Sequence, residues 1–173
     1  MQYFVTTNPS STQQSDCVVV AIFKQADLSP SAMVINDQSK GYIEQIVERG
    51  DITGNAGQTL LLQDVEGITS PRVLLVGMGE KDKTTENNFN TAITAMAKVL
   101  NDSGADDACS YLAEVSVNAR TSNWKIRQTV ITAESSLYKY TQTKSDVKAE
   151  KKPLTNLGFF SQDNDAEQAS KTG

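Results

Sequence analysis

The 173-residue sequence contains no histidine and only two cysteines. Without histidine, the chain lacks the commonest metal ligand, the usual base of a nucleophilic triad and the usual proton shuttle at neutral pH. Cys17 and Cys109 stand far apart, each in a strand-like apolar run, so they predict neither a disulfide framework nor a thiolate metal site. We expect both to be plain buried residues.

Long apolar runs and a secretory leader are also missing. No run approaches the roughly 20 residues needed to span a bilayer. The start, from Met1 to Phe4, lacks the basic and apolar regions of a signal peptide. With an apolar fraction of 38%, the sequence predicts a soluble cytoplasmic protein with one α/β core and no membrane partner.

Strand-like and helix-like patterns alternate along the chain. Strands are predicted at Tyr3–Val5, Cys17–Phe23, Gln58–Val65, Arg72–Val76, Ala108–Val117 and Leu154–Phe160. Helices are predicted at Asn36–Arg49, at Glu86–Asn101 and from about Asn118 to Tyr140. This alternation favours a layered α/β sheet with helices on both faces, in which Gln58–Val65 and Arg72–Val76 lie mid-sheet.

A glycine-rich turn, Gly77-Met78-Gly79, directly follows the strand pattern Arg72–Val76. Such a turn is shared with dinucleotide-binding sites, but the third glycine of that fingerprint would fall at Asp82, and Glu80 adds a second negative charge beside a pyrophosphate. The sequence therefore favours an ordinary strand-to-helix turn in which glycine provides backbone freedom.

The sequence also lacks the motifs of metal sites and of catalytic nucleophiles. Neighbouring carboxylates such as Asp106 and Asp107 occur without the spacing of a calcium loop, and a catalytic zinc would recruit histidine or cysteine. No Gly-x-Ser-x-Gly elbow is present, and no histidine could deprotonate a serine. We expect no catalytic residue and no metal ligand in this chain.

Charge is distributed unevenly. Residues 1–117 carry seven Lys/Arg against fifteen Asp/Glu, whereas residues 118–152 carry eight against three. The candidate nucleic-acid contacts in this basic stretch are Arg120, Lys125, Arg127, Lys144, Lys148, Lys151 and Lys152, with Trp124, Tyr138 and Tyr140 available for stacking. The alternative, which the net charge of −5 favours, is that the aromatic rings face the core and the lysines solvate a surface.

One stretch carries a family resemblance. Gly57-Gln58-Thr59-Leu60-Leu61-Leu62, followed by Ser70-Pro71-Arg72-Val73-Leu74-Leu75-Val76-Gly77-Met78-Gly79, is similar to the paired strands in the amino-terminal domain of leucyl (cytosol) aminopeptidases. The resemblance continues through the later helices and strands and covers nearly the whole chain.

The resemblance implies a macro-domain-like α/β fold over residues 1–160 and a polar linker, residues 161–173, leading to a catalytic domain. In the full enzyme that domain binds two divalent metals, manganese or zinc, and removes amino-terminal residues from peptides within a homohexamer. The family's catalytic signature, Asn-Thr-Asp-Ala-Glu-Gly-Arg, is missing here. The resemblance therefore implies a non-catalytic assembly or regulatory domain whose partner is its own carboxy-terminal catalytic domain.

Two other functions stay open. A macro-domain-like fold is compatible with a module that binds ADP-ribose or a related nucleotide. Some bacterial members of the family bind DNA, for which the basic stretch is the candidate surface.

Overall fold

The computed structural model describes residues 1–143 and 152–162. Its elements are β1 (Gln2–Thr6), β2 (Cys17–Ile22), η1 (Lys24–Ala26), α1 (Pro30–Gln38), α2 (Tyr42–Glu48), β3 (Thr59–Gln63), β4 (Arg72–Gly77), α3 (Glu86–Ser103), β5 (Asp107–Ser110), η2 (Leu112–Glu114), α4 (Ser122–Thr143) and β6 (Asn156–Phe160). The six strands form one sheet in the order β1-β6-β5-β2-β4-β3. Neighbouring strands are parallel, except that β3 runs antiparallel to β4.

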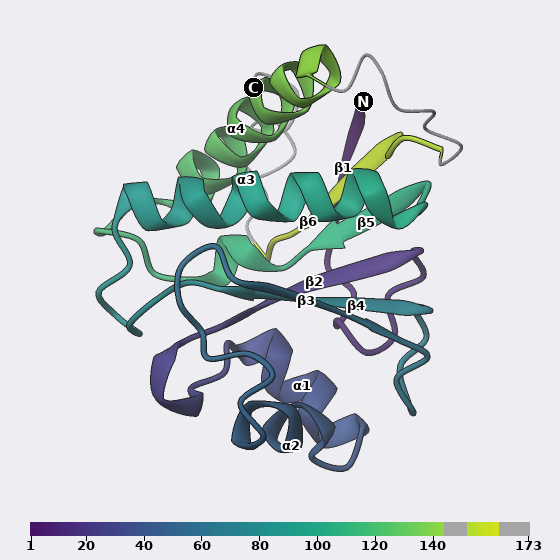
Figure 1. Cartoon of the computed structure of the whole chain (residues 1–173), viewed down its shortest axis with the longest axis vertical. Helices are drawn as coiled ribbons and strands as arrows, with labels where there is room; N and C mark the ends of the chain where they lie inside the picture. Colours follow the sequence, from purple (N-terminus) through teal and green to yellow (C-terminus); the bar gives the residue numbers. More distant parts are fainter. Residues whose placement is uncertain (144–151, 163–173) are drawn as a thin grey trace.

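The sheet separates two helical layers. Helices α1 and α2 lie on one face, and α3 and α4 lie on the other (Figure 1). Each face has its own apolar cluster, one built around α3 and α4 and the other around α1 and α2. The predicted layered α/β architecture is confirmed.

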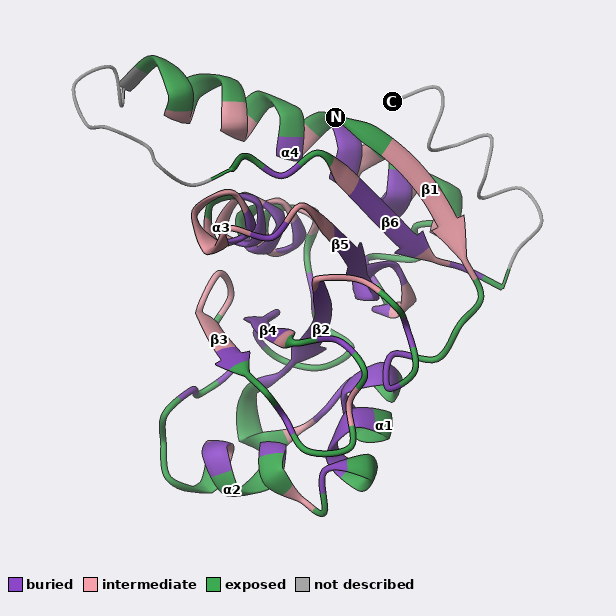
Figure 2. Cartoon of the chain, turned by 90° about the vertical axis from the view of Figure 1, so that its right-hand side faces the viewer, coloured by how far each residue is buried: buried purple, intermediate pink, exposed green. Residues whose placement is uncertain are grey.

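The central position of β2 in the sheet explains why its sequence is apolar throughout. Every residue of Cys17–Ile22 is buried, because helices cover both faces of the sheet at this position (Figure 2). Odd-numbered residues of the strand pack into the cluster with α3, and even-numbered residues pack into the cluster with α1 and α2.

Both cysteines are fully buried, as expected. Cys109 on β5 is in register with Val18 on β2, one position from Cys17. The two thiols therefore belong to opposite faces of the sheet, and each lies in a different apolar cluster. This placement excludes a disulfide between them without rearrangement of the strands.

Helix α3 agrees with its sequence pattern. The side chain of Thr85 accepts a hydrogen bond from the amide of Asn88, and Gly104 ends the helix in the left-handed conformation. The buried stripe consists of Phe89, Ala92, Ile93, Met96, Ala97 and Leu100. These residues fix the helix over the sheet.

The predicted helix Asn36–Arg49 is wrong in its extent. The chain instead forms α1 and α2, separated by Lys40 and Gly41, which both have positive φ. Helix α1 begins earlier than predicted because Ser29 caps it and Pro30 occupies its first turn. Asn36 does not start a helix, and its side-chain oxygen accepts a hydrogen bond from the amide of Glu44.

Three other predicted positions need correction. Strand β3 is an edge strand and does not lie mid-sheet, whereas β4 does. The predicted strand Ala108–Val117 ends at Ser110, where the chain turns into η2. Helix α4 begins at Ser122 because Asn118 and Ala119 have positive φ, which interrupts a helix.

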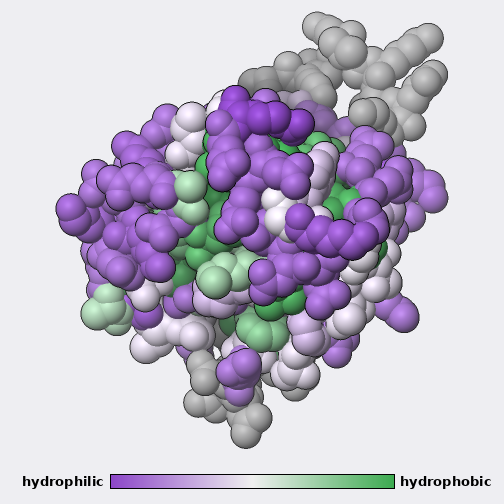
Figure 3. Space-filling view, turned by 90° about the horizontal axis from the view of Figure 1, so that it is seen from below, coloured by the Kyte–Doolittle hydropathy of each residue, from purple (hydrophilic) through white to green (hydrophobic). Residues whose placement is uncertain are grey.

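Strand β6 closes the described part of the chain beside β1. The predicted linker, residues 161–173, lies outside the described residues apart from its first two positions. Among the described residues, no helix is long and apolar enough to cross a membrane. The surface on the α1 and α2 side is mostly hydrophilic, with hydrophobic atoms visible between the polar side chains (Figure 3).

Candidate functional site

The carboxyl edge of the parallel strands is the candidate site on grounds of topology. From β2 the chain crosses one face through α1 and α2 and reaches β4 by way of the edge strand β3. From β5 it crosses the other face through α4 to reach β6. The two connections part at the ends of β2 and β5. Open α/β sheets bind their ligands at such a switch point.

A crevice of about 370 Å³ opens at this point. Its lining comes from the starts of α1 and α4, from η2 and from the end of β6, and consists of Pro30, Ala113, Glu114, Ser122, Phe160, Ser161 and Gln162. Glu114 is the charged residue of this lining and was not singled out from the sequence. No sequence signal marks it, because its role depends on a contact with a helix more than eighty residues earlier in the chain.

Glu114 acts as an internal anion at the start of α1. Its carboxylate oxygens accept hydrogen bonds from the amide and the hydroxyl of Ser31, both at 2.9 Å. Burial raises the pKa of Glu114, although the hydrogen bonds from Ser31 and Ser29 and the charge of Lys125 oppose the rise. The positive end of the α1 dipole, where an external phosphate would bind, therefore already has a carboxylate partner.

The glycine turn after β4 is also occupied by the chain itself. The amides of Gly77, Met78 and Gly79 donate to the carbonyls of Gln58, Ile22 and Gly54 at 2.7, 2.9 and 2.8 Å, respectively. A phosphate-binding turn would leave such amides free to donate to the ligand. In this turn all three amides already donate to carbonyls of the chain, which supports its interpretation as an ordinary strand-to-helix connection.

Close backbone contacts explain why glycine is needed there. A Cβ atom on Gly77 would lie 2.1 Å from the carbonyl oxygen of Asn55, and one on Gly54 would lie 2.2 Å from that of Phe23. The loops after β2, before β3 and after β4 therefore pack main chain against main chain. The glycines make room for these loops and not for a nucleotide.

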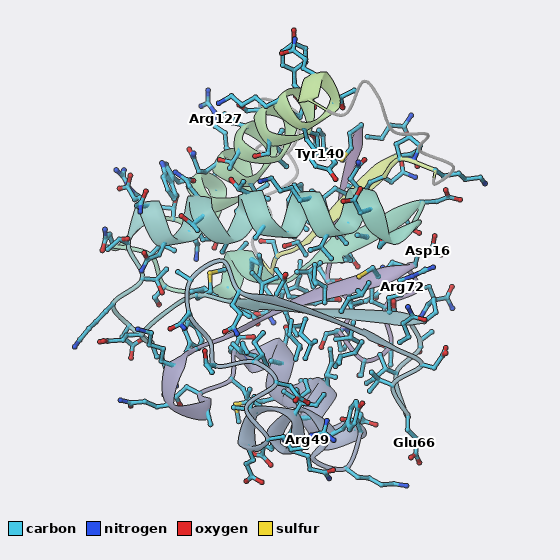
Figure 4. All side chains as sticks on the ribbon, in the orientation of Figure 1. Asp16, Arg49, Glu66, Arg72, Arg127 and Tyr140 are labelled. Carbon is cyan, nitrogen blue, oxygen red and sulfur yellow. The ribbon has the colours of Figure 1, made fainter. Side chains whose placement is uncertain are left out.

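The basic stretch does not form a single surface among the described residues. Arg120 forms an ion pair with Glu86 at 2.7 Å, and its guanidinium carbon lies 5.0 Å from the centre of the Trp124 ring. Arg127 is exposed on α4 (Figure 4). Lys152 lies 3.6 Å from Asp106, which precedes β5 at the opposite, amino edge of the sheet.

Lys125 has to be removed from the candidate contacts. Its side chain is only 6% exposed, and its ammonium group donates a hydrogen bond to the carbonyl of Val115 at 2.8 Å. It therefore holds the loop before α4 and cannot reach a phosphate on the surface. Lys144, Lys148 and Lys151 lie outside the described residues, so their nucleic-acid contacts stay a prediction.

The aromatic residues of this stretch divide between core and surface. Trp124 packs against the apolar cluster beside Phe89, with ring centres 6.2 Å apart. The hydroxyl of Tyr140 donates to the carboxylate of Asp102 at 2.6 Å. Tyr138 is 67% exposed, so it is the one aromatic of the three that is freely accessible for stacking.

Carboxylates at the amino edge stabilise turns. The amide of Asp106 donates to Asp16, and the amide of Asp16 donates to Asp107, at 2.8 and 3.1 Å. Arg72, the first residue of β4, lies beside Asp16, which directly precedes β2 (Figure 4). Within residues 1–143 and 152–162, no cluster of three or more histidine, cysteine, aspartate or glutamate residues is arranged to hold a metal ion.

Comparisons with known proteins agree on a fold. The model of the cytosol aminopeptidase family, N-terminal domain, matches residues 19–147. A tomato leucine aminopeptidase mutant superposes with a TM-score of 0.69 at 13% identity, over 99% of this chain and 35% of that one. The bottromycin maturation enzyme BotP superposes at 0.60 and 18% identity, over 91% of this chain and 29% of that one.

Macrodomains have the same architecture. A Trypanosoma brucei macrodomain in complex with ADP matches with a TM-score of 0.68 at 11% identity, over 98% of this chain and 68% of that one. At such identities, the structural likenesses show the fold alone. The chain spans about a third of the length of the tomato leucine aminopeptidase and of BotP.

Proposed function

Because this chain belongs to the cytosol aminopeptidase family, in which it matches the N-terminal domain, we propose that it is a non-catalytic assembly or regulatory domain. Its partner is the catalytic domain of the same enzyme, which removes amino-terminal residues from peptides. The enzyme acts in the cytoplasm as a homohexamer. These roles of the whole protein rest on the family and not on the geometry of this domain.

The occupied carboxyl edge is the observation that supports a scaffold role. Glu114 partners the first turn of α1, and the amides of Gly77, Met78 and Gly79 bond to the chain's own carbonyls. A ligand-binding version of this fold needs donors that are free to meet an anion. Here the same donors join loops to one another, so the fold serves as a rigid support.

The two divalent metals implied by the family do not fit the residues of this domain. The sequence has no histidine, and the carboxylates Asp16 and Asp107 accept bonds from main-chain amides. We therefore assign the manganese or zinc pair, and the activation of water that it supplies, to the catalytic domain. No step of peptide hydrolysis is assigned to residues of this chain.

Binding of ADP-ribose is the second candidate, favoured by the fold shared with macrodomains. Calorimetric titration of the domain with ADP-ribose separates the two functions, with the Trypanosoma brucei macrodomain titrated with ADP as a parallel positive control. We expect no heat of binding. Saturable binding in the micromolar range would contradict the scaffold role.

Deletion tests the division of labour in the whole enzyme. An enzyme lacking residues 1–160 should keep two metals per subunit, measured by mass spectrometry of bound metal, but lose its hexameric mass in light scattering. The isolated domain supplied with manganese should not hydrolyse leucyl-p-nitroanilide. Loss of metal on deletion, or turnover proportional to the isolated domain, would place catalytic groups in this chain.

A further inference from the structure

Strand β3 leaves one edge of the sheet open. Among residues 1–143 and 152–162 it pairs with β4 alone, and it is the last strand in the sheet order (Figure 1). Its sequence, Thr59–Gln63, contains no charge and no proline, the features with which proteins usually protect an edge from other strands. The open edge is therefore competent to accept another strand.

The bonding pattern shows which groups point outward. The amide of Gly77 donates to Gln58, and the amide of Asp64 donates to Pro71. Antiparallel pairs alternate between bonded and non-bonded positions, so Leu60 and Leu62 bond inward to β4. Residues 59, 61 and 63 turn their amides and carbonyls to the free edge, and the described residues offer these groups no main-chain partner.

The outward groups are arranged symmetrically about Leu61. A second β3 strand running antiparallel, with Leu61 opposite its own copy, brings Thr59 opposite Gln63 at both ends. Every outward amide then meets a carbonyl. The same register places Leu60 opposite Leu62 on the face of α1 and α2, where both already contact the apolar cluster.

We propose that β3 is a self-association edge, at which two copies of this chain pair antiparallel about a two-fold axis through Leu61. The pairing creates no like-charge contact within the strands, because β3 is uncharged. Half-buried Leu60 and Leu61 become covered. This self-association rests on the proposed assembly role, for which it names the surface and the partner.

The surroundings of β3 leave room for this partner. A groove of about 450 Å³ lies between the turn before β3 and the outer side of α3, lined by Ala56, Gly57, Asn90, Thr91, Thr94, Ala95 and Lys98. Lys98 is the charged residue of this lining. Strand β6 is separated from β3 by β5, β2 and β4.

Sedimentation of the full chain at increasing concentration tests the proposal. We expect the mass to rise from the monomeric 18.8 kDa towards twice that value. An edge of five residues is a small interface, so the dimer should be weak, with a dissociation constant on the order of tens to hundreds of micromolar. Association should strengthen with salt, because two copies of net charge −5 repel each other.

Two variants separate the edge from general surface charge. Thr59→Lys with Gln63→Lys places lysines opposite lysines across the proposed axis and should keep the chain monomeric. The control, Gln2→Lys with Gln38→Lys, adds the same charge at two exposed positions on β1 and α1 and should still dimerise. Circular dichroism should report the same folded spectrum for all three proteins.

Amide exchange gives a residue-level readout. At high concentration, the amides of Thr59, Leu61 and Gln63 should gain protection in the wild type and in the control, but not in the edge variant. The amides of Leu60 and Leu62 should be protected in all three. A wild type that stays monomeric at several hundred micromolar, or a dimer that survives in the edge variant, would overturn the proposal. Neither result would alter the ADP-ribose or metal outcomes that test the scaffold role.

Discussion

Glu114 at the end of η2 and Ser31 in α1 join the connections that follow β5 and β2. The carboxylate accepts both the amide and the hydroxyl of Ser31 at 2.9 Å. One residue belongs to the connection after β5 and the other to the first turn of α1 after β2. The contact therefore places a carboxylate at the switch point of the sheet, where open α/β sheets bind their ligands.

The raised pKa of Glu114 predicts a pH-dependent contribution to stability. The folded value lies above the ordinary value of 4.5 because the carboxyl group is buried. Its contribution is thus complete below pH 4.5 and is lost as the pH rises through the folded value. We expect Glu114→Gln to gain in free energy of unfolding, relative to the wild type, as the pH is raised from 4.5 towards 7.

Urea unfolding at a series of pH values measures this difference. Glu48→Gln, which also removes one negative charge but at an exposed position on α2, is the matched control for the change in net charge. If the difference in free energy of unfolding between Glu114→Gln and the wild type stays constant across this pH range, burial is not the main influence on the pKa of Glu114.

The close packing of the glycine loops predicts a large cost for Gly77→Ala. The added Cβ would lie 2.1 Å from the main-chain oxygen of Asn55, so the backbone itself has to move. We expect a loss of about 3 kcal/mol or more in the free energy of unfolding. Gly50 has positive φ, but a Cβ atom there would meet no atom within 4 Å. Gly50→Ala should therefore cost about 1 kcal/mol in free energy of unfolding. Equal costs in chemical denaturation would show that the loops are loosely packed.

Both thiols should be unreactive in the folded protein. Burial raises the pKa of Cys17 and of Cys109 to about 12, so the reactive thiolate is nearly absent at pH 8. We expect negligible labelling by a disulfide reagent under native conditions and two thiols per chain after denaturation in guanidinium. Rapid native labelling of either cysteine would mean that the central strands open readily.

The basic stretch yields a prediction about DNA. With net charge −5, with Lys125 buried and with Arg120 paired to Glu86, we expect no gel shift of duplex DNA at 150 mM salt. The opposite result would be binding that weakens steeply with salt and disappears in the variant Lys148→Glu, Lys151→Glu and Lys152→Glu. That outcome would establish the basic stretch as a DNA surface.

Local chemistry made some elements predictable and left others hidden. Helix α3 has a threonine cap, a regular apolar stripe and a terminal glycine, so its bounds follow from nearby residues. The break between α1 and α2 depends on the left-handed conformation of Lys40, and a lysine in a sequence does not predict that conformation. The edge position of β3 depends on pairing with β4, because periodicity cannot tell an edge strand from a central one.

The candidate site was less predictable than the fold. The absence of histidine and the misplaced Asp82 were sufficient to argue against metal and nucleotide chemistry. The contact between Glu114 and Ser31 joins residues 83 positions apart, and Lys125 is buried because its ammonium group finds the carbonyl of Val115. Such pairings depend on the folded arrangement of loops and have no local signature.

The pairing of β1 with β6 sets an order of events during synthesis. Gly158 lies against the ring of Phe4, where a Cβ atom would come within 2.3 Å of the ring, and the two strands pair in parallel along their whole length. A ribosome releases β1 about 150 residues before β6, so this outer strand has no neighbour until the rest of the sheet has emerged. Strand β1 is therefore made well before β6, with which it pairs, and until β6 emerges its aromatic side chains are open to chaperones.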